Sequence, residues 1–115
     1  MRPAPNPLAP RDLLVLSALA GGPLHGYGII KAVEAESDAA KLLDPANLYR
    51  LLRRMRADGW VEEVPEAGAA EADGRRRAYR LTTRGRDVLL SEVERLEELL
   101  SRVRPVLAGG PGRWE

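Results

Sequence analysis

The sequence predicts a mainly α-helical domain with a small β-hairpin, a winged helix-turn-helix followed by a long C-terminal helix. Three observations lead to this prediction. A short helix between Asp44 and Gly59 carries aliphatic side chains on one face and arginines on the other. After it, the hydrophobic period changes from that of a helix to that of a strand. From Leu89 to Val103, apolar residues recur at alternating steps of four and three, as in a coiled-coil seam.

Length and composition limit the kind of protein and site. With 115 residues and 44% apolar residues, the chain fits one domain. It has no cysteine and one histidine, His25, so we expect a structural role for His25 and no metal or cofactor. No serine has a nucleophile context and no glycine pair forms a phosphate loop, so we expect no enzyme. Without an apolar run of about 18 residues or a signal-peptide core, we expect a cytoplasmic protein and no membrane contact.

Charge is unevenly distributed along the chain. Residues 50–86 contain ten arginines and six acidic residues, a net charge of +4, whereas residues 87–115 contain four arginines and six acidic residues, a net charge of −2. This asymmetry predicts a local electropositive surface for an anionic polymer.

The N-terminal part predicts two helices. Residues 1–8 are proline-rich and are expected to form a flexible arm. A helix from Ala9 or Pro10 to about Leu19 is apolar on nearly every side and should be buried. The sequence Gly21-Gly22-Pro23 ends it, and a second helix opens near His25 and runs to about Glu36. With the helix that follows a loop at 37–43, this is a helix-turn-helix arrangement.

The third helix has clear ends and two distinct faces. Asp44 can cap it, Pro45 fits its first position and Gly59 ends it. At 100° per residue, its aliphatic residues fall within about 60° of one another and form a core face, while Arg50 and Arg53 lie roughly opposite. Such a basic face suits major-groove reading but is also common on solvated surface helices. The core residues are Leu48, Leu51, Leu52 and Met55, and Asn47, Tyr49 and Arg54 flank the basic face.

Two short strands follow. Residues 60–64 and 77–81 alternate as strands on either side of a loop at 65–74, which predicts a hairpin with a mobile tip. Arg75, Arg76 and Arg77 lie where the return strand leaves the tip. They suit a wing that follows the DNA backbone or enters the minor groove, or a basic linker in solvent.

The chain ends in a long helix capped by Thr82 or Thr83 and reaching about Arg104, where Pro105 begins its end. Its apolar seam is wider than one packing stripe requires, so it should bury against a second copy of the chain; the alternative is that it folds back on its own domain. The tail from Ala108 should be flexible. The seam residues are Leu89, Val93, Leu96, Leu100 and Val103.

Three motifs in this order resemble the PadR family of bacterial transcriptional regulators over residues 10–104. They are Gly22-Pro23-Leu24-His25-Gly26-Tyr27, the Leu48-Tyr49 helix with Leu52-Arg53-Arg54-Met55, and Tyr79-Arg80-Leu81-Thr82 followed by Gly85. The chain departs from the family at Trp60, where an aliphatic residue is usual, and at Arg50, which replaces a residue that is often proline or small.

The resemblance implies a homodimer that binds a palindromic operator in double-stranded DNA, usually as a repressor. The expected domains are the arm at 1–8, the DNA-binding domain at 9–82, the dimerisation helix at 83–107 and the tail at 108–115. Some members of the shorter branch bind aromatic effectors at the dimer interface, but no aromatic residue lies on this seam. The implied DNA-binding residues are Tyr27, Asn47, Tyr49, Arg50, Arg53, Arg54, Arg75, Arg76 and Arg77.

Tyr27 and Tyr49 are equally consistent with DNA contact and with bracing the helix pair. The alternative function for the whole chain is a winged-helix protein-interaction module whose basic face meets an acidic partner or solvent.

Overall fold

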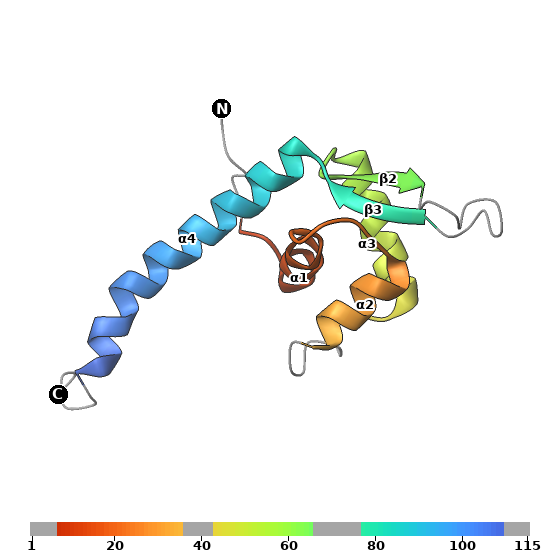
Figure 1. The fold of residues 1–115 in the computed structure, drawn as a ribbon. Helices are drawn as coiled ribbons and strands as arrows, with labels where there is room; N and C mark the ends of the chain where they lie inside the picture. The colour runs from red at the N-terminus through yellow and green to blue at the C-terminus, as the bar shows by residue number, and fades with distance from the viewer. Residues whose placement is uncertain (1–6, 36–42, 66–76, 110–115) are drawn as a thin grey trace.

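The computed structural model describes residues 7–35, 43–65 and 77–109. Three helices come first: α1 (Pro10–Leu19), α2 (Gly26–Glu34) and α3 (Pro45–Ala57). The hairpin strands β2 (Val61–Pro65) and β3 (Arg77–Leu81) follow, and then α4 (Thr83–Ala108). The C-terminal half of α4 extends well beyond the other helices and the sheet (Figure 1). The predicted mainly helical fold with a hairpin and a long C-terminal helix is therefore confirmed.

One further strand was not predicted from the sequence. Residues Leu24–His25 form β1, which pairs antiparallel with β3, with Leu24 opposite Tyr79 and His25 opposite Ala78. The sheet therefore has three strands in the order β1-β3-β2. A two-residue strand is too short to show the alternation that identifies strands in sequence. The structure thus places His25 in the sheet, directly before α2.

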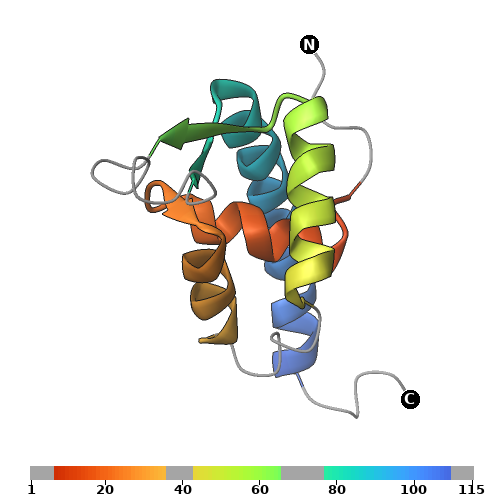
Figure 2. The same cartoon turned by 90° about the vertical axis from the view of Figure 1, so that its right-hand side faces the viewer.

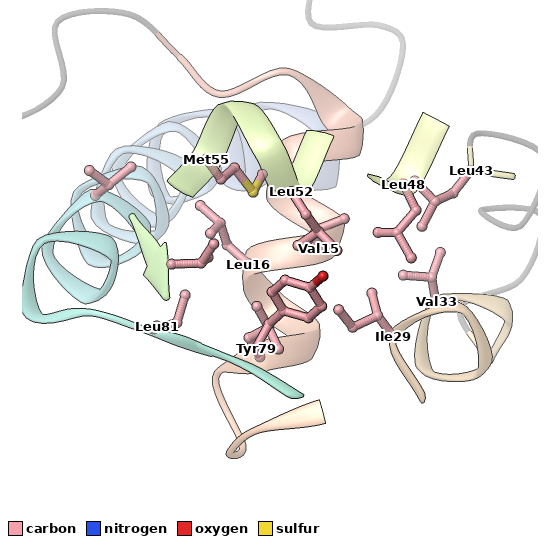
Figure 3. Close-up of a cluster of buried hydrophobic side chains, with 13 residues drawn as sticks. Val15, Leu16, Ile29, Val33, Leu43, Leu48, Leu52, Met55, Tyr79 and Leu81 are labelled. Atoms are coloured by element: carbon pink, nitrogen blue, oxygen red, sulfur yellow. The ribbon is translucent and has the colours of Figure 1, made fainter. Parts of the chain in front are cut away.

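The core forms where α1 meets the other elements. Figure 2 looks onto α2 and α3, with α1 passing behind them. Val15 and Leu16 of α1 lie at the centre of the cluster in Figure 3 and are fully buried. The nearly apolar circumference of α1 explains this position, because a helix without a polar face must be covered on several sides. The side chains around them are Ile29, Val33, Leu43, Leu48, Leu52, Met55, Tyr79 and Leu81.

The end of α3 is fixed by a left-handed glycine. Gly59 has φ +80°, its N–H donates to the Arg56 carbonyl, and the Trp60 N–H donates to the Met55 carbonyl at 2.8 Å. This pair of bonds is the Schellman motif, which satisfies carbonyls that the helix leaves open. Because Trp60 is part of that motif, β2 begins one residue later than the sequence suggested, at Val61.

The same turn anchors the start of α4. The Thr82 hydroxyl donates to the Gly59 carbonyl at 2.5 Å and accepts from the Gly85 N–H at 3.0 Å, which identifies Thr82 as the N-cap. The Thr82 N–H donates to the Trp60 carbonyl at 3.0 Å. Gly85 packs so closely on that carbonyl that a Cβ would overlap it.

The C-terminal end of α4 corrects one expectation. The sequence predicted a helix that reaches about Arg104 and begins to end at Pro105, whereas α4 continues to Ala108 with Pro105 inside it. Proline removes one backbone donor from the last turns, and residues 101–109 are all exposed, so water can satisfy the carbonyl that loses its partner.

A buried carboxylate joins α4 to the N-terminal segment. The Glu92 side chain is 6% exposed and accepts from Arg95 Nη2 at 2.6 Å and Arg95 Nε at 3.1 Å. It also accepts the backbone N–H of Leu8. The hydrogen bonds from Arg95 lower the pKa of Glu92, burial opposes that shift, and the Leu8 N–H adds to it. This contact has no local signature in the sequence, because Glu92 resembles the other acidic residues of a charged helix.

Gly85→Ala should destabilise the protein, because the new methyl group would push α4 away from the Trp60 carbonyl. We expect a loss of about 1 to 3 kcal/mol in the free energy of unfolding, measured by urea denaturation. Gly21→Ala is the matched control, since nothing lies within 4 Å of a Cβ there. Equal stability of the two variants would contradict the close contact at Gly85.

Glu92 should make stability depend on pH in the acidic range. Its lowered folded pKa means that the charged carboxylate stabilises the native state above the unfolded pKa of about 4.3, and that this contribution is lost as the pH falls through the folded value. Urea titrations from neutral pH downward should therefore show the free energies of unfolding of wild type and Glu92→Gln converging as the pH falls below the folded pKa of Glu92. Glu98→Gln, on the exposed side of α4, should show no such convergence.

Candidate nucleic-acid interface

The two faces of α3 are separated as the sequence predicted. Leu48, Leu52 and Met55 are at most 1% exposed, and the partly buried Leu51 packs against the same core. Arg50 and Arg53 are exposed on the other side, with Tyr49 beside them. Burying the aliphatic face therefore fixes the direction in which the arginines project.

A chain of hydrogen bonds organises the first turn of α3. Asp44 is the N-cap and accepts the Asn47 N–H at 2.9 Å through one carboxylate oxygen. Its other oxygen accepts from Asn47 Nδ2 at 3.2 Å, and Asn47 Oδ1 accepts from Arg50 Nη1 at 2.8 Å. The cap thus orients Asn47, and Asn47 orients Arg50. A guanidinium has five N–H donors in a planar fork, so this bond leaves Arg50 able to meet an acceptor pair on a base or phosphate.

Arg54 has a partner that the sequence did not suggest. Its Nη2 lies 2.7 Å from Oδ1 of Asp12, a carboxylate on α1 that is only 10% exposed. The pair ties the last turn of α3 to the first turn of α1 and gives the buried Asp12 carboxylate its counter-charge. The structure therefore assigns Arg54 a structural contact, and its predicted contact with DNA stays a prediction.

The two tyrosines of the predicted interface differ. Tyr27 is 65% exposed, with the Lys31 ammonium 5.7 Å from its ring centroid. Tyr49 is about half exposed, and its hydroxyl lies against Gly26 so closely that a Cβ at Gly26 would overlap it. Tyr49 therefore packs α3 against the start of α2, while the Tyr27 ring is open to solvent.

The hairpin carries paired charges beside α3. Glu63 of β2 lies 3.1 Å from Arg56 Nη1 and 3.8 Å from Arg77 Nε, and Glu62 lies 2.6 Å from Arg80 Nε. Of the three wing arginines, only Arg77 belongs to the described residues; Arg75 and Arg76 lie outside them, as do most of the predicted hairpin loop. Neither Arg56 nor Glu63 was singled out from the sequence, because their proximity depends on how β2 packs beside α3.

Tyr79 lies on the inner face of the hairpin. It is 8% exposed and stands opposite Glu63 in the register of β2 and β3. Burial raises the pKa of Tyr79, and the negative charge of Glu63 raises it further. The Tyr79 phenol is thus neutral at ordinary pH and fills the space between the sheet and the helices.

The predicted dimerisation seam lies mostly in the open on α4. Val93, Leu100 and Val103 are 37%, 50% and 38% exposed, whereas Leu89 and Leu96 are partly buried. Leu89 packs against the core of its own chain. The first turns of α4 thus belong to the domain, and the rest presents an apolar stripe that Leu107, 62% exposed, extends.

Neither a metal site nor a membrane span is found in the part of the chain that the structure describes. Within it, no three His, Cys, Asp or Glu side chains gather in a way that could hold a metal ion. None of the helices in the same part combines the length and the apolarity needed to cross a membrane.

Comparison with known proteins agrees with this geometry. The model of the transcriptional regulator PadR-like family matches residues 15–91. A 37.1 kDa protein of transposon Tn4556 from Streptomyces fradiae is 41% identical over 92 residues. That match covers 80% of this chain but 24% of the relative, so the chain spans about a quarter of that protein's length.

Solved structures show the same fold. A PadR family transcription regulator from Clostridium difficile is 26% identical, with a TM-score of 0.62 and coverage of 85% of this chain and 94% of that one. The PadR-like regulator BC4206 from Bacillus cereus is 18% identical and superposes with a TM-score of 0.71 over 87% of this chain and 93% of that one. The arginine-bearing helix, the adjoining hairpin and the long terminal helix therefore agree with the family match, and the chain belongs to the PadR-like family of transcriptional regulators, winged helix-turn-helix proteins that are not enzymes.

Proposed function

We propose that this protein is a homodimeric repressor that binds a palindromic operator in double-stranded DNA. The observation that carries the proposal is the outward face of α3, where Arg50 and Arg53 project beside Asn47 while the opposite face is buried. A helix held in this way can enter the major groove, which is wide enough to admit it. We expect it to act in the cytoplasm, on bacterial DNA.

The side chains on this face suit the chemistry of base edges. Arginine can bond both acceptors of guanine, and asparagine can bond the donor and acceptor of adenine. Asn47 orients Arg50 from within the same helix, so little side-chain freedom would be lost when Arg50 binds. We therefore assign sequence readout to Arg50 and Arg53, with Asn47 and Tyr49 framing them.

The hairpin supports a role as the wing. Arg77 begins β3 next to the groove that α3 borders, and Arg75 and Arg76 precede it in sequence. Contacts of such arginines with phosphates position a protein on DNA without reading its sequence. Tyr27, exposed near the start of α2, is a further candidate for a phosphate contact.

The stripe on α4 supports dimerisation. At 100° per residue, the side chains of Val93, Leu96, Leu100, Val103 and Leu107 fall within about 40° of one line along the helix. Most of this stripe is exposed in the single chain, and a second copy would bury it. A two-fold axis through α4 would present two α3 helices to successive major grooves, roughly 34 Å apart. A small-molecule effector stays a prediction of the family resemblance.

Replacing Arg50 or Arg53 by alanine should weaken operator binding and relax sequence preference, because each change removes a contact with a base edge. Genomic fragments captured at near-physiological salt would supply the operator, and gel-shift titration would measure the loss, about 1 to 3 kcal/mol for each base contact. Arg102→Ala removes the same charge from α4, far along the chain from α3, and should bind normally. Unchanged operator affinity in both α3 variants would refute their role in readout.

Introducing aspartate at Leu96 and Leu100 should convert the dimer into monomers, because the stripe would then bury unpaired charges. Sedimentation velocity would show the change in mass. Ser101→Asp is the control, since it adds one aspartate to an exposed position of α4 away from the stripe. A dimer that persists in the double variant would refute dimerisation through α4.

A further inference from the structure

A groove runs between the second half of α3 and the hairpin. Three arginines line it, Arg53 and Arg56 from α3 and Arg77 from β3, together with Ala57 of α3 and with Val61, Glu62 and Glu63 of β2. The proposed function uses Arg53 for base readout and Arg77 for the wing. It gives no role to Arg56 or to Glu63, although both lie between those two residues.

Glu63 engages two of these arginines at once. One carboxylate oxygen lies 3.1 Å from Arg56 Nη1 and the other lies 3.8 Å from Arg77 Nε. The carboxylate is 26% exposed, while the Arg56 and Arg77 side chains are 49% and 50% exposed. The oxygens of Glu63 thus occupy a position that faces two half-exposed guanidinium groups.

The neighbouring Glu62 also borders the groove, but its carboxylate pairs with a different arginine. Successive side chains on a strand point to opposite faces, so Glu62 points away from the face that carries Glu63. Glu62 stands opposite Arg80 in the strand register and pairs with it at 2.6 Å. With Glu62 neutralised by Arg80, the charges left in the groove are three arginines and the single carboxylate of Glu63, a net charge of +2.

A carboxylate and a backbone phosphate are equivalent ligands for arginine. Each presents two oxygens that share a negative charge, and a guanidinium fork can bind them through two parallel N–H bonds. An exposed ion pair such as Arg56 with Glu63 contributes little free energy, so a phosphate can displace the carboxylate at small cost. DNA seated on α3 would bring its backbone towards this groove, because the wing lies on the groove's other side.

We propose that this groove binds a phosphate of the DNA backbone through Arg56 and Arg77, and that the Glu63 carboxylate occupies the phosphate position until DNA displaces it. The inference rests on the proposed DNA-binding function and adds two residues to it. Glu63 acts as a competing anion, so it lowers affinity for DNA of any sequence and leaves base preference to Arg50 and Arg53. Arg56 is the phosphate ligand on which that competition depends.

The test measures binding to a fluorescein-labelled duplex of mixed sequence, about 30 base pairs long, by anisotropy across a series of salt concentrations. Arg56→Ala should weaken binding and reduce the slope of log affinity against log salt by about 0.9 per protomer, because one phosphate contact is lost. Glu63→Gln should strengthen binding by up to about fivefold, since it removes the competing charge. In the Arg56→Ala background, the gain from Glu63→Gln should fall to that of a carboxylate that does not pair with Arg56.

Two matched variants serve as references, one for the gain in affinity and one for the salt slope. Glu62→Gln removes the same charge from the adjacent residue, and its smaller gain should be the same with or without Arg56. Arg102→Ala removes an arginine from a comparable exposed pair on α4 and should leave the salt slope unchanged. Thermal unfolding checks that each variant is folded, and Arg56→Gln replaces Arg56→Ala if the latter is not.

The outcomes separate the two proposals. Weaker or unchanged binding by folded Glu63→Gln would overturn the competing-anion role, and an unchanged salt slope in the Arg56 variant would overturn the phosphate contact. Either result would leave the readout by Arg50 and Arg53 intact. Failure of the wild-type protein to bind any duplex, even at low salt, would instead refute DNA binding itself.

Discussion

The burial of the aliphatic face of α3 against the core is the constraint on which the rest of the structure depends. Leu48, Leu52 and Met55 meet the fully buried Val15 and Leu16 of α1 in one cluster. Truncating one such side chain to alanine costs about 2 to 5 kcal/mol, a large part of the stability of a domain this size. Because side chains follow one another at 100° around a helix, this anchoring also determines where the arginines point. The face proposed to read DNA is thus oriented by the face that never meets it.

One short turn fixes the hairpin and α4 relative to α3. The left-handed Gly59 ends α3, and its carbonyl accepts the hydroxyl of Thr82, which caps α4. The Trp60 carbonyl accepts the Thr82 N–H, and Gly85 packs directly on this Trp60 carbonyl. Helix, hairpin and terminal helix therefore diverge from one hydrogen-bonded turn. In a dimer formed through α4, the position of each α3 relative to the two-fold axis would be set by this turn.

Internal carboxylates divide the arginines into different classes. Asp12 holds Arg54, Glu92 holds Arg95, and Glu63 lies between Arg56 and Arg77. A buried carboxylate needs its arginine, because leaving it unpaired inside the protein is costly. The pair at Glu63 is different, since its carboxylate is 26% exposed, against 10% for Asp12 and 6% for Glu92, and borders a groove. The burial of its carboxylate partner, rather than the presence of an arginine in a basic segment, indicates whether that arginine can leave its partner to bind DNA.

Local signals in the sequence by themselves determined the helices, both ends of α3, the start of α4 and the two faces of α3. Asp44, Gly59 and Thr82 act within a few residues of their own position, and helical periodicity needs no knowledge of the fold. The family could be inferred for the same reason, since its motifs are short and contiguous. Only the tertiary structure decided the pairing of β1 with β3, the contact of Arg54 with Asp12 and the position of Glu63 between two arginines. Each joins residues far apart in the chain, and the free energy that selects such partners comes from packing the core, which no short stretch of sequence contains.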